Sequence, residues 1–157
     1  MMVMLCCYFL QLQGASVFEV SDKTIDVKKL RSSIENPKSG GVCIFEGWVR
    51  NQNEGRNVEQ LEYEVYKPLA IIEGEKIIDE AKNHFLFLEA VCSHRSGLLN
   101  IGDCAVWVGV SSKHRDEAFK ACRFIIDEIK IRLPIWKKEY YLDGDSGWVN
   151  CERCANV

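Results

Sequence analysis

The strongest constraint on the fold is an apolar stripe that ends at a proline in the last third of the chain. Its members are separated by four, three, one, three and four residues, which describes one face of a helix. They are Ala118, Cys122, Ile125, Ile126, Ile129 and Leu133. Pro134 lacks a backbone donor and disfavours helical angles at Leu133, so the helix is expected to end at Arg132 or Leu133. The pattern predicts a core helix followed by an extended segment.

The residues just before this stripe are typical of a helix start. Ser111 and Ser112 carry short side-chain oxygens that can accept a hydrogen bond from a free amide of the first turn. Asp116 and Glu117 place negative charge where the helix dipole favours it. We therefore expect one of the two serines to cap the helix.

Strands and helices alternate along the rest of the chain. We expect two further helices, one that begins at Asp26 and one over 69–83 behind Pro68. Strands are expected directly after Val17 and over 42–49, 58–66, 86–92, 104–111, 139–142 and 148–149. The polar, alternating face of 58–66 favours an antiparallel pair with 42–49. The predicted fold class is α/β in the broad sense (α+β), with a mixed, largely antiparallel sheet and packed helices.

Composition limits the number of domains and the kind of partner. With 157 residues, 47% of them hydrophobic, the chain can bury one core of ordinary size. We expect an N-terminal extension over 1–17, one domain over 18–150 and a short C-terminal tail over 151–157. The net charge of -3 provides no global basic field, so no nucleic acid and no membrane is expected as a partner. Any anion site must be local.

The first ten residues, MMVMLCCYFL, are apolar. No basic residue precedes Lys23, so the positive region of a secretion signal is missing, and ten residues cannot span a bilayer as a helix. We interpret this run as a strand extension or as residues upstream of the functional start.

Four of the eight cysteines fall within apolar strand or helix patterns, where a free thiol behaves as a small buried hydrophobe. They are Cys43, Cys92, Cys104 and Cys122. This usage indicates a reducing compartment and predicts a cytoplasmic protein. Cys151 and Cys154 form a single C-x-x-C, but a tetrahedral zinc site needs two more ligands at a workable place, so no metal site is expected.

Three polar segments, taken together in their order along the chain, identify a protein family more specifically than any one of them does alone. They are V-R-N-Q-N-E-G over 49–55, S-S-K-H-R over 111–115 and K-x-R-x-P-x-W-K-K-E over 130–139. The strand L-E-Y-E-V-Y and the turn S-H-R-S-G fit the same pattern. Over roughly residues 18–149, the chain resembles the large, catalytic subunit family of molybdopterin synthase.

The resemblance implies an α/β hammerhead fold and an enzyme of molybdenum-cofactor biosynthesis, a sulfurtransferase. Such an enzyme converts cyclic pyranopterin monophosphate into the dithiolene of molybdopterin. The sulfur would come from the thiocarboxylated C-terminus of a small ubiquitin-like sulfur-carrier subunit. The large subunit is expected to form a homodimer within a heterotetramer, and the transfer itself is expected to need no cofactor, metal or nucleotide.

The resemblance also assigns roles to residues at matching motif positions. Lys130 and Lys137 are the expected catalytic residues. The expected substrate-binding residues are Trp48, Val49, Arg50, His114, Arg115, Lys130, Lys137, Lys138 and Glu139. Phe45 and Ile126 are expected to line the pocket.

The chemistry of these side chains agrees with the assigned roles. A substrate phosphate and a reacting acyl tail are both negative, so a pocket for them needs fixed cations. Lys130 is flanked by the apolar stripe, and partial desolvation would suit it to acid–base work or to a place beside the thiocarboxylate carbon. The planar guanidinium of Arg50 suits bidentate phosphate binding, although pairing with Glu54 is the alternative. His114 and Arg115 oppose the helix dipole, which points to a function rather than to helix stability. The resemblance implies that they bind substrate in the site of a neighbouring protomer.

Other interpretations remain open for several residues. Lys138 can be a surface charge, and Phe45 and Ile126 can be plain core packing. His94 and Arg95 are expected to be structural. Trp48 stands where some relatives carry a lysine, and the short tail differs from theirs, which leaves some substrate contacts in doubt. The rival function is a non-catalytic module that binds a ubiquitin-like tail without chemistry.

Overall fold

The structure, a computed structural model, describes residues 17–150. Within them the helices are α1 (Val27–Ser33), α2 (Lys67–His84) and α3 (Arg115–Arg132). The strands of the first sheet are β1 (Phe18–Ser21), β2 (Gly41–Trp48), β5 (Glu89–Arg95) and β7 (Cys104–Ser112). Those of the second are β3 (Gln52–Asn53), β4 (Arg56–Val65), β6 (Gly97–Asn100), β8 (Ile135–Tyr141), β9 (Gly144–Asp145) and β10 (Val149–Asn150).

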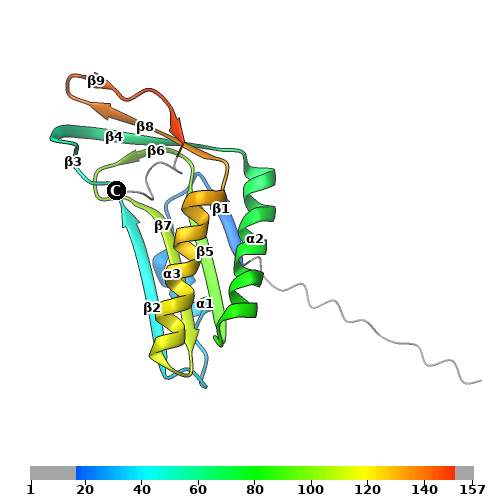
Figure 1. Ribbon diagram of the computed structural model, residues 1–157. Coiled ribbons are helices and arrows are strands. Elements are labelled where there is room, and N and C mark those ends of the chain that lie inside the picture. Colours follow the sequence, from blue (N-terminus) through cyan, green and yellow to red (C-terminus); the bar gives the residue numbers. More distant parts are fainter. Residues whose placement is uncertain (1–16, 151–157) are drawn as a thin grey trace, which may run out of the picture.

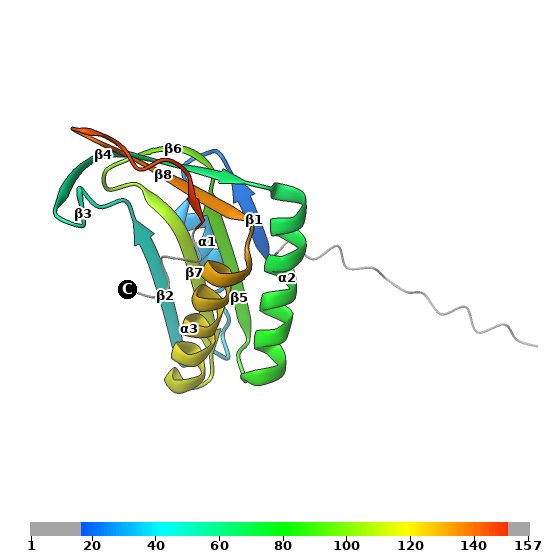
Figure 2. The same cartoon turned by 45° about the horizontal axis from the view of Figure 1, so that its top comes forward.

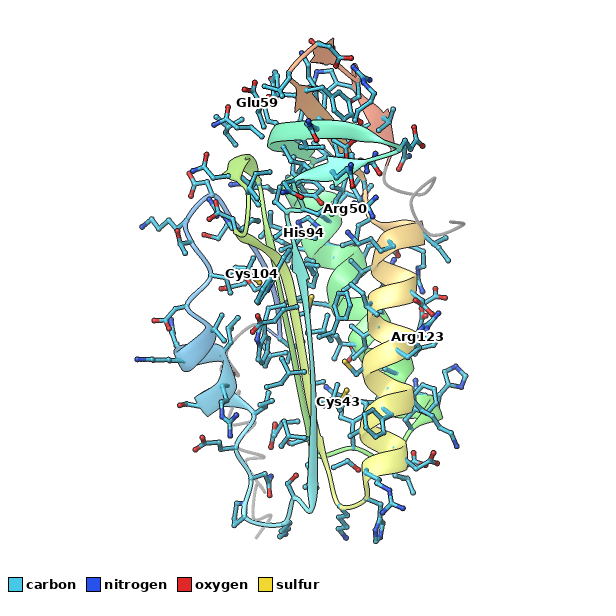
Figure 3. The ribbon with its side chains drawn as sticks, turned by 90° about the vertical axis from the view of Figure 1, so that its left-hand side faces the viewer. Cys43, Arg50, Glu59, His94, Cys104 and Arg123 are labelled. Atoms are coloured by element: carbon cyan, nitrogen blue, oxygen red, sulfur yellow. The ribbon has the colours of Figure 1, made fainter. Side chains whose placement is uncertain are left out.

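The first sheet has the order β1-β5-β7-β2, with β1 parallel to β5 and the other pairs antiparallel. Helices α2 and α3 lie side by side on one face of this sheet, and α1 lies on the other (Figures 1 and 3). The second sheet, ordered β10-β8-β4-β3 with β6 and β9 attached, lies across one end of the first (Figures 1 and 2). The predicted α/β class is confirmed, with two sheets in place of one.

The central strand β7 divides the core into two parts. Val106, Val108 and Val110 pack with the buried residues of α2 and α3. Trp107 points the other way and packs against Leu30 and Ile34 at α1. This alternation is the period of two expected for a strand covered on both faces. No helix within residues 17–150 is long and apolar enough to cross a membrane.

The predicted pairing of 42–49 with 58–66 is wrong. β2 pairs with β7, whereas β4 pairs with β8, β6 and β3. The polar segment between β2 and β4 makes its own tight turn, in which Glu54 and Gly55 both have positive φ, 49° and 76°. The chain therefore leaves the first sheet after Trp48 and enters the second.

The end of α3 is where Pro134 places it, because Leu133 is already extended at φ -75° and ψ 139°. The predicted serine caps are wrong. Ser111 and Ser112 are buried in β7, and the N-cap residue is His114, whose side chain makes no capping bond. The hydroxyl of Ser112 instead donates to the Leu86 carbonyl at 3.0 Å, which ties it to the strand layer.

Asp26 caps α1 as expected, since its carboxylate accepts the amide of Lys29 at 3.0 Å. Pro68 lies in the first turn of α2, as predicted. The turn expected after Cys92 is instead the end of β5 and the short strand β6, which are separated by Ser96.

Candidate functional site

Strand β8 presents two different faces where it crosses the end of α3. Glu139 and Tyr141 are buried on one face and Lys137 is half-buried beside them. Lys138 and Tyr140 alternate with them on the other face. The sequence places the two lysines next to each other, but the strand sends them in opposite directions.

Glu139 is the centre of a polar network on the inner face. Its carboxylate pairs with the Lys137 ammonium at 3.1 Å and accepts the Asn53 amide at 2.8 Å. The Tyr141 hydroxyl donates to the same carboxylate. Burial opposes the charged form, yet the tyrosine hydrogen bond, the charge of Lys137 and the amide lower the pKa of Glu139. Glu139 therefore stays ionised and fixes the ammonium of Lys137.

Arg50 joins the same network from the end of β2. Its guanidinium donates to the side-chain oxygen of Asn53, and the Asn53 amide in turn donates to Glu139. The pairing with Glu54 considered from the sequence does not form among the described residues. Arg50 lies toward the end where α3 finishes (Figure 3). Glu139 thus holds Lys137 directly, and Asn53 links the exposed Arg50 to the same carboxylate.

The two residues that precede Arg50, at and just beyond the end of β2, differ in exposure. Val49 is buried and exchanges backbone hydrogen bonds with the 102–103 turn, at 3.0 Å and 2.8 Å. Trp48 is 67% exposed, and its indole donates to Glu46 at 2.9 Å. Val49 can therefore act on a substrate only through its backbone or by holding the strand end, whereas Trp48 offers a free aromatic face.

Lys130 is half-buried on the last turn of α3. Its ammonium lies 5.8 Å from the centre of the Tyr63 ring, and Tyr63 is the cross-strand neighbour of Lys137. The side chain also lines a pocket of about 430 Å³ between α3 and β2. The lining residues are Cys43, Ile44, Phe45, Phe119, Cys122, Arg123, Ile126, Asp127 and Lys130. Phe45 and Ile126 thus share one apolar pocket with Lys130.

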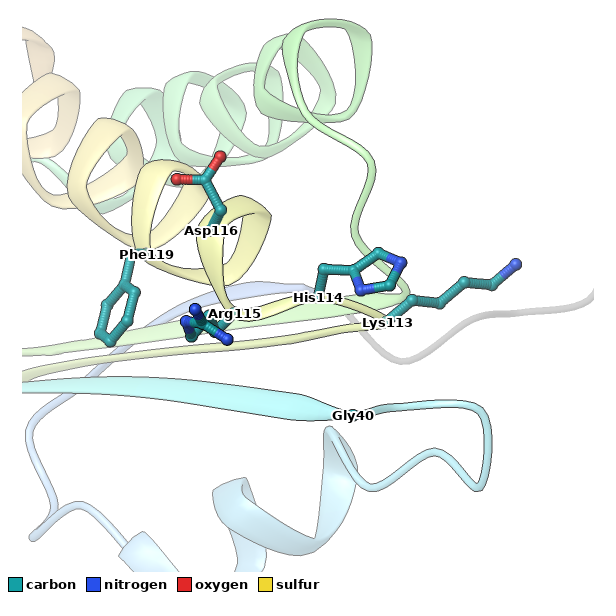
Figure 4. A pocket seen from close by; sticks show the side chains of 6 residues that line it. All are labelled: Gly40, Lys113, His114, Arg115, Asp116 and Phe119. Carbon is teal, nitrogen blue, oxygen red and sulfur yellow. The ribbon is translucent and has the colours of Figure 1, made fainter.

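His114 and Arg115 lie at the opposite end of α3. With Lys113, Asp116, Phe119 and Gly40 they line a second pocket of about 580 Å³, which shares Phe119 with the Lys130 pocket (Figure 4). Arg115 and Lys130 are fifteen residues apart on one helix, which corresponds to about 22 Å along the helix axis. Within one chain these cations therefore lie far from the Lys130 ammonium.

Lys138 belongs to neither group. Its ammonium pairs with Asp145 at 3.2 Å and lies 5.0 Å from the Tyr140 ring centre. The Asp145 hydrogen bond raises the pKa of Lys138. Its side chain is 21% exposed, against 16% for Lys137, so the two lysines differ in their face of β8 and in their partner more than in burial.

Sequence reasoning missed three polar residues around the site. Asn53 and Tyr141 hold Glu139, and Tyr63 faces Lys130. The alternation over 58–66 indicates that Tyr63 points inward, but no local signal reveals what it meets there. His94 and Arg95, predicted to be structural, are buried on β5, and Arg95 pairs with Asp103 at 3.1 Å.

The thiols show no cluster suited to a metal. Cys43, Cys92, Cys104 and Cys122 are free, and no group of three or more potential metal ligands is found within residues 17–150. Cys151 and Cys154, and all of the predicted 1–17 extension except Val17, lie outside the described residues.

These features define an α/β protein in which a half-buried lysine lines an apolar pocket, and two further cations are joined by a polar network around Glu139. Comparison with known proteins identifies the family to which the chain belongs. The family model described as "MoaE protein" matches residues 20–132. The molybdopterin synthase catalytic subunit of Thermoplasma volcanium is 42% identical over 130 residues, covering 83% of this chain and 95% of that protein. The subunit of Bos taurus is 34% identical over 151 residues, covering 90% and 80%.

Solved structures agree. The crystal structure of molybdopterin synthase from Staphylococcus aureus has a TM-score of 0.81 at 37% identity, covering 86% of this chain and 98% of that one. A Helicobacter pylori structure, described as a complex of subunits 1 and 2 of molybdopterin-converting factor, shares the fold with a TM-score of 0.68 at 22% identity; it covers 82% of this chain and 88% of that one. The chain belongs to the MoaE family, the family of molybdopterin synthase catalytic subunits. It is an enzyme subunit of molybdenum-cofactor biosynthesis.

Proposed function

We propose that the chain transfers sulfur to cyclic pyranopterin monophosphate from the thiocarboxylated tail of a small ubiquitin-like subunit. The product is the dithiolene of molybdopterin. One observation carries the proposal: Arg50 and Lys137 are fixed by the network around Glu139, and Tyr63, the cross-strand neighbour of Lys137, faces Lys130. An anionic substrate and an anionic tail can be held together there with little reorganisation.

The surroundings of Arg50, Lys137 and Lys130 support different roles for the three cations. Arg50 and Lys137 hold the phosphate and the pterin, because the Glu139 network sets the position of both. Lys130 faces the apolar pocket that includes Phe45 and Ile126, where an extended peptide tail finds apolar walls. Its ammonium pairs with the thiocarboxylate and is placed to move a proton during transfer. Glu139 acts by holding Lys137, and Lys138 stays outside the site.

His114 and Arg115 act in the site of a second copy of the chain. They are exposed and lie about 22 Å along α3 from Lys130. A homodimer that aligns the N-terminal end of one α3 with the Lys130 pocket of the other copy supplies the missing cations. With one small subunit for each chain, the assembly is a heterotetramer. The free thiols of the described residues support a reducing, cytoplasmic compartment.

Lys137 and Lys138 provide a matched test of substrate binding. They are adjacent on β8 and face opposite ways, so Lys137→Ala and Lys138→Ala remove the same charge from the chain. We expect Lys137→Ala to weaken binding of cyclic pyranopterin monophosphate by about 10- to 100-fold in calorimetric titration, and Lys138→Ala by less than about twofold. Equal losses for the two variants would contradict the assignment.

The alternative function is a module that holds a ubiquitin-like tail without chemistry. The cationic network speaks against it, because an apolar groove needs no buried carboxylate to fix a lysine for tail binding alone. A wild-type chain that binds the thiocarboxylated partner tightly but yields no molybdopterin would favour the module.

A further inference from the structure

Lys130 meets an aromatic ring that itself has almost no freedom to move. Tyr63 is 8% exposed, and its strand β4 is hydrogen-bonded on both sides, with Lys137 opposite on β8 and Gly97 opposite on β6. The ring belongs to the main apolar core. Its position is therefore set by the second sheet, independently of Lys130.

A buried histidine packs against the same ring. His94 lies edge-on to Tyr63, with ring centres 5.0 Å apart and planes at 88°. His94 is fully buried, and its Nδ1 lies 2.7 Å from the Arg95 carbonyl, which can only accept, so Nδ1 carries the proton. Its Nε2 has no hydrogen-bond partner in the described part of the chain. Burial, and then the charge of Lys130, lower the pKa of His94 to about 3, so the imidazole is neutral and does not repel the ammonium.

The Lys130 ammonium lies 5.8 Å from the Tyr63 ring centre, within the range of a cation–π interaction. On a half-buried lysine such a contact selects among side-chain rotamers that water would otherwise leave equally populated. We propose that Tyr63 is a positioning residue for the proposed reaction: its ring, held between the second sheet and His94, fixes the Lys130 ammonium at the wall of the pocket. This inference rests on the proposed function, in which Lys130 does the chemistry.

The test compares ring removal with ring retention at one position. Tyr63→Phe keeps the ring, whereas Tyr63→Leu and Tyr63→Met remove it and retain an apolar side chain. In a reconstituted reaction with cyclic pyranopterin monophosphate and thiocarboxylated partner, we expect both ring-less variants to lower kcat about tenfold. KM for the pterin should change less than about twofold, because Arg50 and Lys137 are untouched. Tyr63→Phe should stay within about twofold of the wild-type kcat.

Leu61→Ala is the matched control for loss of packing. Leu61 is on the same strand and the same face as Tyr63 and is also 8% exposed, but it does not face Lys130. Urea unfolding of each variant shows how much stability is lost, and all rates are compared at a temperature where every variant is folded. Leu61→Ala is expected to lose stability without the fall in kcat.

Two results would overturn the inference. One is a kcat for Tyr63→Leu and Tyr63→Met no lower than that of Leu61→Ala; the other is a loss for Tyr63→Phe equal to that for Tyr63→Leu. Lys130→Ala, measured alongside, separates this failure from that of the proposed function. If Lys130→Ala is inactive while the ring-less variants match the control, only the positioning role is wrong. If Lys130→Ala retains the wild-type rate, the role of Lys130 itself is wrong.

Discussion

The two ends of α3 both carry cations, but they hold them in different ways. At the C-terminal end, Lys130 faces a buried ring, and the adjacent Lys137 is fixed by Glu139. At the N-terminal end, residues 113–115 are exposed, and none of them forms an ion pair with another described residue. The first arrangement is complete within one chain. The second is an exposed set of charges with no ion-pair partner among residues 17–150, so substitutions at the two ends should have different effects.

Glu139→Ala should give the largest loss of stability. It leaves the half-buried Lys137 ammonium without its carboxylate and removes the acceptor for Asn53 and Tyr141, so we expect about 3 kcal/mol lower free energy of unfolding. Asp145→Ala, which removes the exposed partner of Lys138, is the control and should cost only a small fraction of that. Urea denaturation at neutral pH measures both. Similar losses would mean that the network is no stronger than a surface pair.

The buried histidine near Lys130 should make stability depend on pH. The pKa of His94 is lowered to about 3 by burial and by Lys130, whereas the ordinary value is 6.5. Below pH 6.5 the unfolded chain therefore binds a proton at His94 that the folded chain does not bind. Protonation of His94 therefore leaves the free energy of unfolding unchanged above pH 6.5. As the pH falls from 6.5 toward 3, it lowers the free energy of unfolding by roughly 1.4 kcal/mol for each pH unit.

Two matched variants isolate that slope. In urea unfolding measured from about pH 7 to pH 5, His94→Gln should remove the slope and His114→Gln, at the exposed end of α3, should retain it. An unchanged slope in His94→Gln would show that other groups cause the acid sensitivity.

The exposed end should respond in the opposite manner. Arg115→Ala removes no ion pair within the described residues, so the free energy of unfolding should change by less than about 0.5 kcal/mol. Turnover should nevertheless fall, because the guanidinium serves the site of the second copy. Mixing Arg115→Ala chains with Lys130→Ala chains should recover activity, since a mixed dimer contains one site with both cations. No recovery, despite exchange of subunits seen by mass spectrometry, would place both residues in the same chain's site.

Local signals predicted the parts of the fold that depend on nearby residues. Pro134 marks the end of α3 and Asp26 caps α1, because both effects act within one turn. The N-cap of α3 was missed because Ser111 and Ser112 are equally suited to a strand end, and the hydroxyl of Ser112 found a partner in Leu86. The division into two sheets depends on pairing between strands that are far apart in the sequence. The hydrophobic periodicity of each strand does not predict that pairing.

The candidate site shows the same difference between features that nearby residues predict and features that depend on long-range pairing. Motif positions predicted functional roles for Arg50, Lys130 and Lys137. In the structure Lys137 pairs with Glu139, and Arg50 is linked to the same carboxylate through Asn53. Asn53, which links Arg50 to Glu139, lies in a polar loop, where the sequence predicts only that a side chain is exposed to solvent. That Lys137 and Lys138 face opposite ways follows from the alternation of β8, and only the pairing with β4 decides which of them faces inward.

The most direct test of the whole account is single turnover of the reconstituted enzyme. The wild-type chain, cyclic pyranopterin monophosphate and the thiocarboxylated small subunit are mixed, and molybdopterin is followed as its fluorescent oxidised derivative. We predict product with the wild type and a loss of at least about a hundredfold with Lys130→Ala, while affinity for the small subunit stays within about threefold. Product formation by Lys130→Ala at the wild-type rate would contradict the account.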